Sequence, residues 1–261
     1  FEKKIKLRNY FKLLAFLFLL ASLSCSSKKN IVYFQDISDN NNLNFEFVDH
    51  KIKPGDILSI SILIDNPENL VSLNNANPTT ALKNRESKIF DGYIVDKNGF
   101  IEYPQIGNVK LGNLSIEDAK LILKNKLSDL QILTNPIIDL KVLNWNFTII
   151  GEVNRPGKYY FDEPNFNFLQ AIGVAGDLTI NGQRDKIKLI RNIDGNLKSF
   201  DIDLTKSDFI NQISFQIFSG DIIVINPNLS RVKNAGIIGN SGTLVSLLSF
   251  LLSSIIIISS N

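Results

Sequence analysis

The stretch FEFVDHKIKPGDILSISIL, residues 46–64, decides how the chain folds. Residues 59–62 alternate polar and apolar side chains after Ile57, which is the pattern of a strand with one buried face. The run Pro54-Gly55-Asp56 predicts a turn, because Pro fixes φ, Gly accepts a positive φ and Asp caps the backbone. Gly-Asp-Ile before an apolar strand recurs at residues 220–222, which predicts two small units of related build.

The first of these units is expected over residues 46–144. Tyr93-Ile94-Val95 and Phe100–Tyr103 flank an Asn-Gly pair, which predicts a β-hairpin because that pair accepts positive φ. The other elements expected here are a polar loop over residues 65–88, a helix over 116–128 that opens at a Ser115 cap, and a strand over 138–142.

The second unit is expected over residues 145–228. Strands over 147–153 and 158–161 are predicted to pair across the turn Arg155-Pro156-Gly157. We predict that Gly157 needs a backbone geometry that a Cβ atom would disfavour. The remaining elements are a helix over 168–174 with an Asn167 cap and Gly176 at its end, strands over 187–191 and 197–202 joined at Asp194-Gly195, and a last strand after Gly220. The predicted fold class is therefore α+β.

Composition excludes several classes of function. Apolar residues make up 44% of the 261 residues, enough for a buried core. The net charge of +2 comes from the N-terminus, where residues 1–24 hold five basic residues and one acidic residue. The rest of the chain is near neutral, which argues against a nucleic-acid partner. With one cysteine and one histidine, Cys25 and His50, the chain offers neither an internal disulfide nor a zinc site, and no cofactor is expected.

The N-terminal segment has the order of a secretory signal. A basic region precedes the apolar run LLAFLFLLASL at residues 13–23, which is too short to span a bilayer. Ser22-Leu23-Ser24-Cys25 resembles a bacterial lipobox, so we predict a lipoprotein signal peptide over 1–24, a lipid on Cys25 and a polar tether over 25–45. The alternative is an ordinary signal peptide with an incidental cysteine.

The C-terminal segment is uncharged from Asn234 to Asn261. Residues 236–258 would form a helix about 35 Å long, so a transmembrane helix is predicted over 235–259. Its small and polar residues recur at intervals of three and four, which places them on one helix face. This stripe is predicted to line a pore or a helix interface, the alternative being a plain anchor; it consists of Gly239, Gly242, Ser246, Ser249 and Ser253.

The first unit resembles the polysaccharide export domain of Wza-type outer-membrane lipoproteins, and the second resembles the soluble-ligand-binding β-grasp domain. The runs that carry the first resemblance are Lys51–Asp56, Val95–Ile101, Pro104–Gly107, Ser115–Ala119 and Asn135-Pro136. The runs that carry the second are Gly151–Val153, Arg155–Tyr159, Leu169–Ile172 and Ala175–Asp177. The chain departs from the best-known members in having one β-grasp domain instead of two or more, and in its uncharged C-terminal helix.

The resemblance implies a homo-oligomeric ring in the outer membrane, lipid-anchored and with periplasmic domains, through which polysaccharide passes without covalent chemistry. It also implies an inner-membrane polysaccharide co-polymerase with a tyrosine kinase region as partner. The residues alone leave open a membrane-anchored glycan-binding module that forms no pore. An envelope enzyme is disfavoured, because Asp56 and Asp221 each sit in a turn as backbone caps and His50 has no partner nearby in sequence. Trp145, Tyr159 and Tyr160 could stack on sugars, although core packing is the commoner role.

Overall fold

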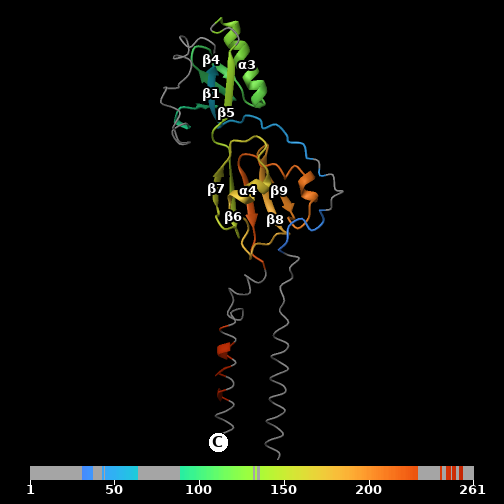
Figure 1. The fold of residues 1–261 in the computed structure, drawn as a ribbon. Helices are drawn as coiled ribbons and strands as arrows, with labels where there is room; N and C mark the ends of the chain where they lie inside the picture. Colours follow the sequence, from blue (N-terminus) through green and yellow to red (C-terminus); the bar gives the residue numbers. More distant parts are fainter. Residues whose placement is uncertain are drawn as a thin grey trace, which may run out of the picture.

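Two α+β units follow each other along the chain and are stacked end to end (Figure 1). The computed structural model describes residues 31–37, 43, 45–63, 89–131, 133, 136–228, 242, 245–247, 249–250 and 253–254. The first unit carries β1 to β5 and α3, and the second carries β6 to β10 and α4. This mixture of strands and short helices agrees with the predicted fold class.

The first unit is a three-stranded antiparallel sheet of order β2-β1-β5, with a helix against it and a separate hairpin. Its elements are β1 (Ile57–Leu63), β2 (Tyr93–Ile94), β3 (Phe100–Tyr103), β4 (Gly107–Lys110), α3 (Ile116–Asp129) and β5 (Ile137–Val142). Ser115 caps α3 by accepting from the Asp118 N–H, as the sequence predicts. The helix buries Ala119, Leu123 and Leu127, and their spacing fixes which of its faces meets the core.

The hairpin predicted between residues 93–95 and 100–103 is wrong. β2 pairs with β1, and β3 pairs with β4. The Asp96 carboxylate explains the difference, because its Oδ1 accepts from the N–H groups of Asn98 and Phe100, each at 2.8 Å. The loop folds around this carboxylate, and β3 leaves it toward β4.

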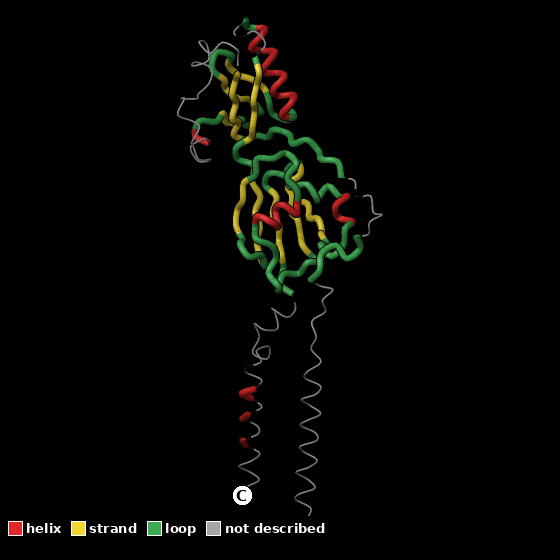
Figure 2. Tube along the Cα trace, in the orientation of Figure 1, coloured by secondary structure: helices red, strands yellow, loops and turns green. Residues whose placement is uncertain are grey.

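The second unit is a five-stranded sheet of order β7-β6-β10-β8-β9, with α4 across it (Figure 2). β10 pairs parallel with β6 and antiparallel with β8, so the first and last strands lie at the centre with a hairpin on either side. This is the strand order of a β-grasp sheet; that the unit binds a soluble ligand stays a prediction. The elements are β6 (Asn146–Gly151), β7 (Gly157–Tyr160), α4 (Phe168–Val174), β8 (Ile187–Ile193), β9 (Asn196–Ile202), η4 (Asp208–Asn211) and β10 (Asp221–Ile225).

Local signals in the second unit have the structures that the sequence predicts. Asn167 and Gln170 form a reciprocal capping box at the start of α4. Gly176 follows the helix with φ +76°. Asp194 and Gly195 both have positive φ between β8 and β9, which suits a tight hairpin turn.

The two Gly-Asp turns are built alike. Asp56 Oδ2 accepts from the Lys53 N–H and Asp221 Oδ2 from the Phe218 N–H, each at 2.8 Å. The glycine before each aspartate has a positive φ, 87° in one turn and 90° in the other. Each aspartate therefore holds its own turn, and the two do not form a pair for glycoside hydrolysis.

The prediction for Gly157 is wrong, and the constraint lies at Gly151. Gly157 has no positive φ, and a Cβ built on it meets nothing within 4 Å. Gly151 has φ +99°, and a Cβ there would lie 1.9 Å from the carbonyl oxygen of Ile225. β6 and β10 approach each other closely at this point, so only glycine fits without strain.

Candidate functional site

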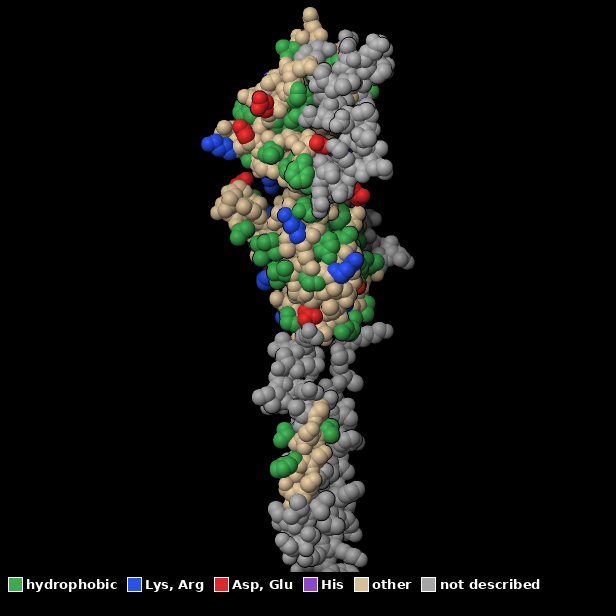
Figure 3. Space-filling model, turned by 90° about the vertical axis from the view of Figure 1, so that its left-hand side faces the viewer, with side chains coloured by type: hydrophobic (Ala, Val, Ile, Leu, Met, Phe, Trp, Pro, Cys, Tyr) green, Lys and Arg blue, Asp and Glu red, His purple; other side chains and the backbone are tan. Residues whose placement is uncertain are grey.

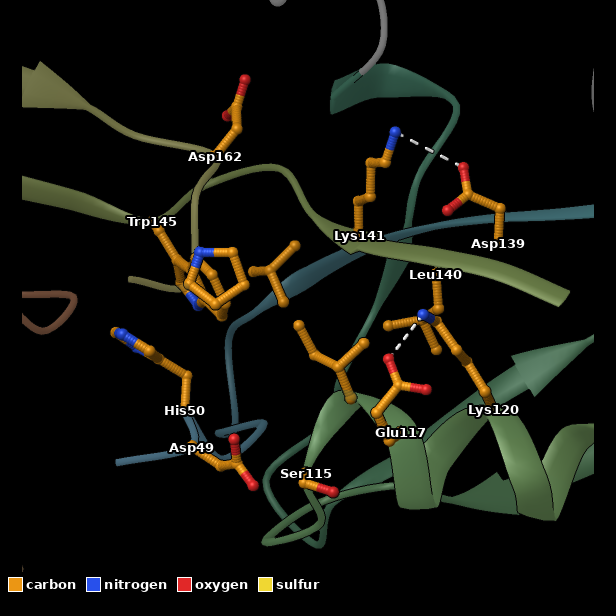
Figure 4. A pocket seen from close by; sticks show the side chains of 13 residues that line it. Asp49, His50, Ser115, Glu117, Lys120, Asp139, Leu140, Lys141, Trp145 and Asp162 are labelled. Atoms are coloured by element: carbon orange, nitrogen blue, oxygen red, sulfur yellow. Dashed lines mark hydrogen bonds and ion pairs between the residues drawn. The ribbon is translucent and has the colours of Figure 1, made fainter. Parts of the chain in front are cut away.

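A cleft of about 260 Å³ lies where the two units meet. Its walls come from the start of α3, from β5 and from the segments on either side of β6 and β7 (Figure 4). Viewed from the side, the surface is indented between the units (Figure 3). The residues that line the cleft are Asp49, His50, Ser115, Ile116, Glu117, Lys120, Asp139, Leu140, Lys141, Val142, Trp145, Asp162 and Pro164.

An aromatic cluster around His50 closes one side of the cleft. The His50 ring lies 4.5 Å from the Trp145 ring and 4.6 Å from the Phe218 ring, measured between centroids. His50 is 5% exposed and Trp145 2% exposed. His50 Nε2 has no hydrogen-bond partner among the residues that the structure describes. Trp145 therefore packs the junction of the two units and offers no open face to a sugar.

The two tyrosines named with Trp145 lie elsewhere. Tyr159 packs on Phe147 and donates its hydroxyl to the Arg155 carbonyl at 2.5 Å. Tyr160 is 46% exposed, and the Lys158 ammonium lies 5.3 Å from its ring centroid. Neither tyrosine lines the cleft, so the three aromatic residues do not form one sugar-binding surface.

Charged side chains on the cleft wall are partly paired. Lys120 binds Glu117 at 2.7 Å and Lys141 binds Asp139 at 3.5 Å (Figure 4). Asp49 and Asp162 add two further carboxylates. Within the described ranges no three metal-ligating side chains come together. The wall can offer hydrogen-bond donors and acceptors to a polar ligand such as a sugar hydroxyl.

Burial sets the charge state of His50. Loss of water lowers the pKa of His50 from its ordinary value of 6.5 to about 4, with Lys53 and Arg191 also lowering it. A hydrogen bond with the Pro164 backbone and the charge of Asp49 act in the other direction. The imidazole is therefore neutral at neutral pH, and the uncharged ring packs against the rings of Trp145 and Phe218.

Acid should destabilise the protein through His50. Because the folded pKa lies below the unfolded one, unfolding takes up a proton as the pH falls from 6.5 toward 4. We expect a loss of up to about 3 kcal/mol in unfolding free energy over this window. Urea titrations at a series of pH values measure it, and His50→Phe should remove most of the slope. An unchanged slope in the variant would assign it to carboxylates instead.

The family comparison concerns the first unit. The family described as polysaccharide biosynthesis/export protein matches residues 48–143. This range contains every strand from β1 to β5 together with α3. Residues 48–143 match a polysaccharide export domain. Residues 48–143 are called the export domain from here on. The match suggests a role in polysaccharide export and is consistent with a Wza-type protein. No curated relative matches the chain.

The predicted site residues fall in three separate places. Pro54, Gly55 and Asp56 form the turn before β1 in the export domain, with only Asp56 buried. Arg155, Pro156 and Gly157 lie between β6 and β7 in the second unit. Neither group lines the cleft. Cys25 and Gly239 lie outside the described residues.

The described part of the C-terminal stripe is helical. Ser246, Ser249 and Ser253 each donate a hydroxyl to the carbonyl four residues earlier, at 2.8 to 2.9 Å. Those hydroxyls are satisfied within their own helix and do not by themselves indicate a wet lumen. Within the part of the chain that the structure describes, no helix is long and apolar enough to cross a membrane. The predicted span over 235–259 lies mostly outside that part.

Residues 31–37 bind the second unit, a contact that no sequence pattern predicted. Within the predicted tether, Phe34 and Gln35 donate backbone N–H groups to the carbonyls of Leu204 and Thr205. The Phe34 ring stacks on Phe209, with centroids 6.1 Å apart. Further along, the Gln216 side chain accepts from the Val48 N–H and donates to its carbonyl, both at 2.8 Å. Residues 31–37 and 45–48 are called the strap below.

Proposed function

We propose that this chain is a subunit of an oligomeric outer-membrane channel that exports capsular or extracellular polysaccharide without catalysing a reaction. The observation that carries the proposal is the export domain over the whole first unit. The β-grasp order of the second unit supports it, because the two units occur in the order that a Wza-type protein would have. The export domain supports a role in moving polysaccharide, and the ring, the pore and the membrane are the further steps proposed.

The envelope location rests on the two apolar ends of the sequence. A lipid on Cys25 and a helix over 235–259 would hold the chain to the outer membrane, with both described units in the periplasm. A helix satisfies its own backbone hydrogen bonds, so a ring of such helices is physically allowed in a bilayer. Polysaccharide would then pass along the ring axis, supplied by an inner-membrane co-polymerase with a tyrosine kinase region.

The cleft favours a second candidate function. A polar-walled cavity next to a buried aromatic cluster suits a glycan-binding module, anchored to the membrane and forming no pore. The two functions differ in assembly, since a pore needs a closed ring of subunits and a binding module does not.

The oligomeric state of the full chain after detergent extraction tests the proposal. We expect native mass measurement to give one discrete oligomer and negative-stain images to show rings with a central opening. Deletion of residues 235–259 in the same preparation is the control, because a ring closed by those residues should then lose mass or open. A monomer or a dimer in the full chain would remove the channel and leave the binding module.

A further inference from the structure

Several loops gather at the end of the second unit that faces away from the export domain. β6 and β10 run parallel and end there at Gly151 and Ile225, and β8 begins there at Ile187. The loops that follow or precede these strands, together with residues 31–37, are called the distal loops. Figure 1 shows them at the opposite end from β1, β4 and α3.

The strap is fastened to one of these loops, residues 177–184. The Tyr33 hydroxyl donates to Asp177 Oδ1 at 2.5 Å. The Arg184 guanidinium lies 5.2 Å from the centroid of the Tyr33 ring, in cation–π contact. Arg184 is itself 5% exposed and donates to the Gly182 carbonyl at 3.1 Å. The first described segment of the chain is thus held at this loop.

The last described residues of the second unit bind the same loop. Asn228 donates its backbone N–H to the Asn181 carbonyl at 2.7 Å and its side-chain amide to the Ile180 carbonyl at 3.3 Å. Pro227 forms a β-bridge with Gly182. Both the entry of the chain into the folded units and its departure from them are therefore fixed at residues 177–184.

Outward from these two fixed points, the sequence is first basic and then apolar. The apolar runs 13–23 and 236–258 lie beyond the two points. The short stretches between, residues 26–30 and 229–235, contain Lys28, Lys29, Arg231 and Lys233 and no acidic residue. Cationic side chains beside an apolar run are placed to meet lipid phosphates.

The distal loops expose apolar side chains where these runs depart. Ile180 is 64% exposed and Val32 is 41% exposed, although both belong to segments fixed by buried or paired polar groups. A large apolar side chain held outward on a rigid loop is costly in water and favourable in the boundary layer of a bilayer.

We propose that the distal loops rest on a lipid bilayer, with Ile180 and Val32 in the interface. The proposal rests on the proposed function only in taking the two apolar runs as membrane anchors. It adds a contact between the folded unit and the membrane. It also fixes the second unit upright, because the surface held against the lipid is opposite the export domain.

Tryptophan quenching by lipid tests the contact. The chain has one tryptophan, Trp145, which is 2% exposed, so its own emission is blue-shifted and shielded from lipid; the spectrum of the parent chain is therefore subtracted from that of each variant. Full-length Ile180→Trp is reconstituted in vesicles of phosphatidylethanolamine and phosphatidylglycerol, with and without nitroxide-labelled phosphatidylcholine. We expect a blue-shifted emission that the nitroxide lipid quenches strongly, above the quenching of the parent chain.

Leu197→Trp is the matched control. Leu197 is 74% exposed, but it pairs with Asn192 near the other end of the β8–β9 hairpin, away from the distal loops. Its emission should stay red and unquenched, and both variants should unfold thermally like the parent chain.

Equal quenching of the two variants would overturn the proposal. A blue shift at position 180 without lipid quenching would also overturn it, since a second copy would then cover the loop. Closed rings without quenching at position 180 would reject the membrane contact and leave the proposed channel intact. Quenching at position 180 without rings would reject the channel and leave the membrane contact intact.

Discussion

Gly151→Val should unfold the second unit or lower its unfolding free energy by about 4 kcal/mol. A loss this large is expected because the substitution combines a strained backbone with a buried steric clash. The left-handed φ of Gly151 is disfavoured for a β-branched residue. The added Cβ would also meet the Ile225 carbonyl oxygen, which accepts from the Glu152 N–H at 2.9 Å. Parting β6 from β10 would open the centre of the sheet. Urea unfolding followed by circular dichroism measures the loss.

Gly157→Val is the matched control for this substitution. The same change, placed six residues later at the start of β7, meets no atom within 4 Å and no positive φ. It should cost less than about 1 kcal/mol. If both variants lost stability equally, the close approach of β6 and β10 would not be the reason for glycine at position 151.

Arg191→Met should cost about 4 kcal/mol, because it leaves the Asp221 carboxylate buried without its partner. The two side chains are 6% and 0% exposed, and the guanidinium donates to both carboxylate oxygens, at 2.9 and 2.7 Å. It also donates to the carbonyl of Gln216 at 2.6 Å and packs against the ring of Phe218. Chemical unfolding at neutral pH measures the effect.

The pH dependence of this variant separates lost charge pairing from lost packing. Burial raises the pKa of the Asp221 carboxyl, and Arg191 opposes that rise. Without Arg191 the folded state binds the proton more readily than the unfolded state, so the deficit should shrink as the pH falls through the raised pKa. A deficit that stays constant with pH would point to packing alone. Lys188→Met, which breaks an exposed pair with Asp201, should cost less than about 1 kcal/mol.

Features that depend on neighbouring residues were accessible from the sequence. The Ser115 and Asn167 caps, the two Gly-Asp turns and the Asp194-Gly195 hairpin each close hydrogen bonds or turns within a few residues. Their side chains carry the preference for that geometry wherever they occur. The alternation of residues 59–62 predicted β1, again from neighbouring residues alone.

Features that join distant residues were not accessible in this way. β2 pairs with β1, although residues 64–88 lie between the two strands in the sequence. Position 151 requires glycine because β10 passes close to it. Arg191 and Asp221 gave no local signal of pairing, since 30 residues separate them. The cleft combines residues from 49 to 164, so its lining could not be read from any single motif.

The strap also sets the order in which the chain can fold. Its partner Gln216 lies 168 residues after Val48, so the strap has nothing to bind while the export domain is being synthesised. The export domain draws all its strand pairings from residues 57–142 and can close before the second unit exists. Closing so long a loop is slow, and the strap is among the last contacts to form. Until then, residues 31–37 and 45–48 are open to proteases, and a chain truncated before Gln216 would leave them so permanently.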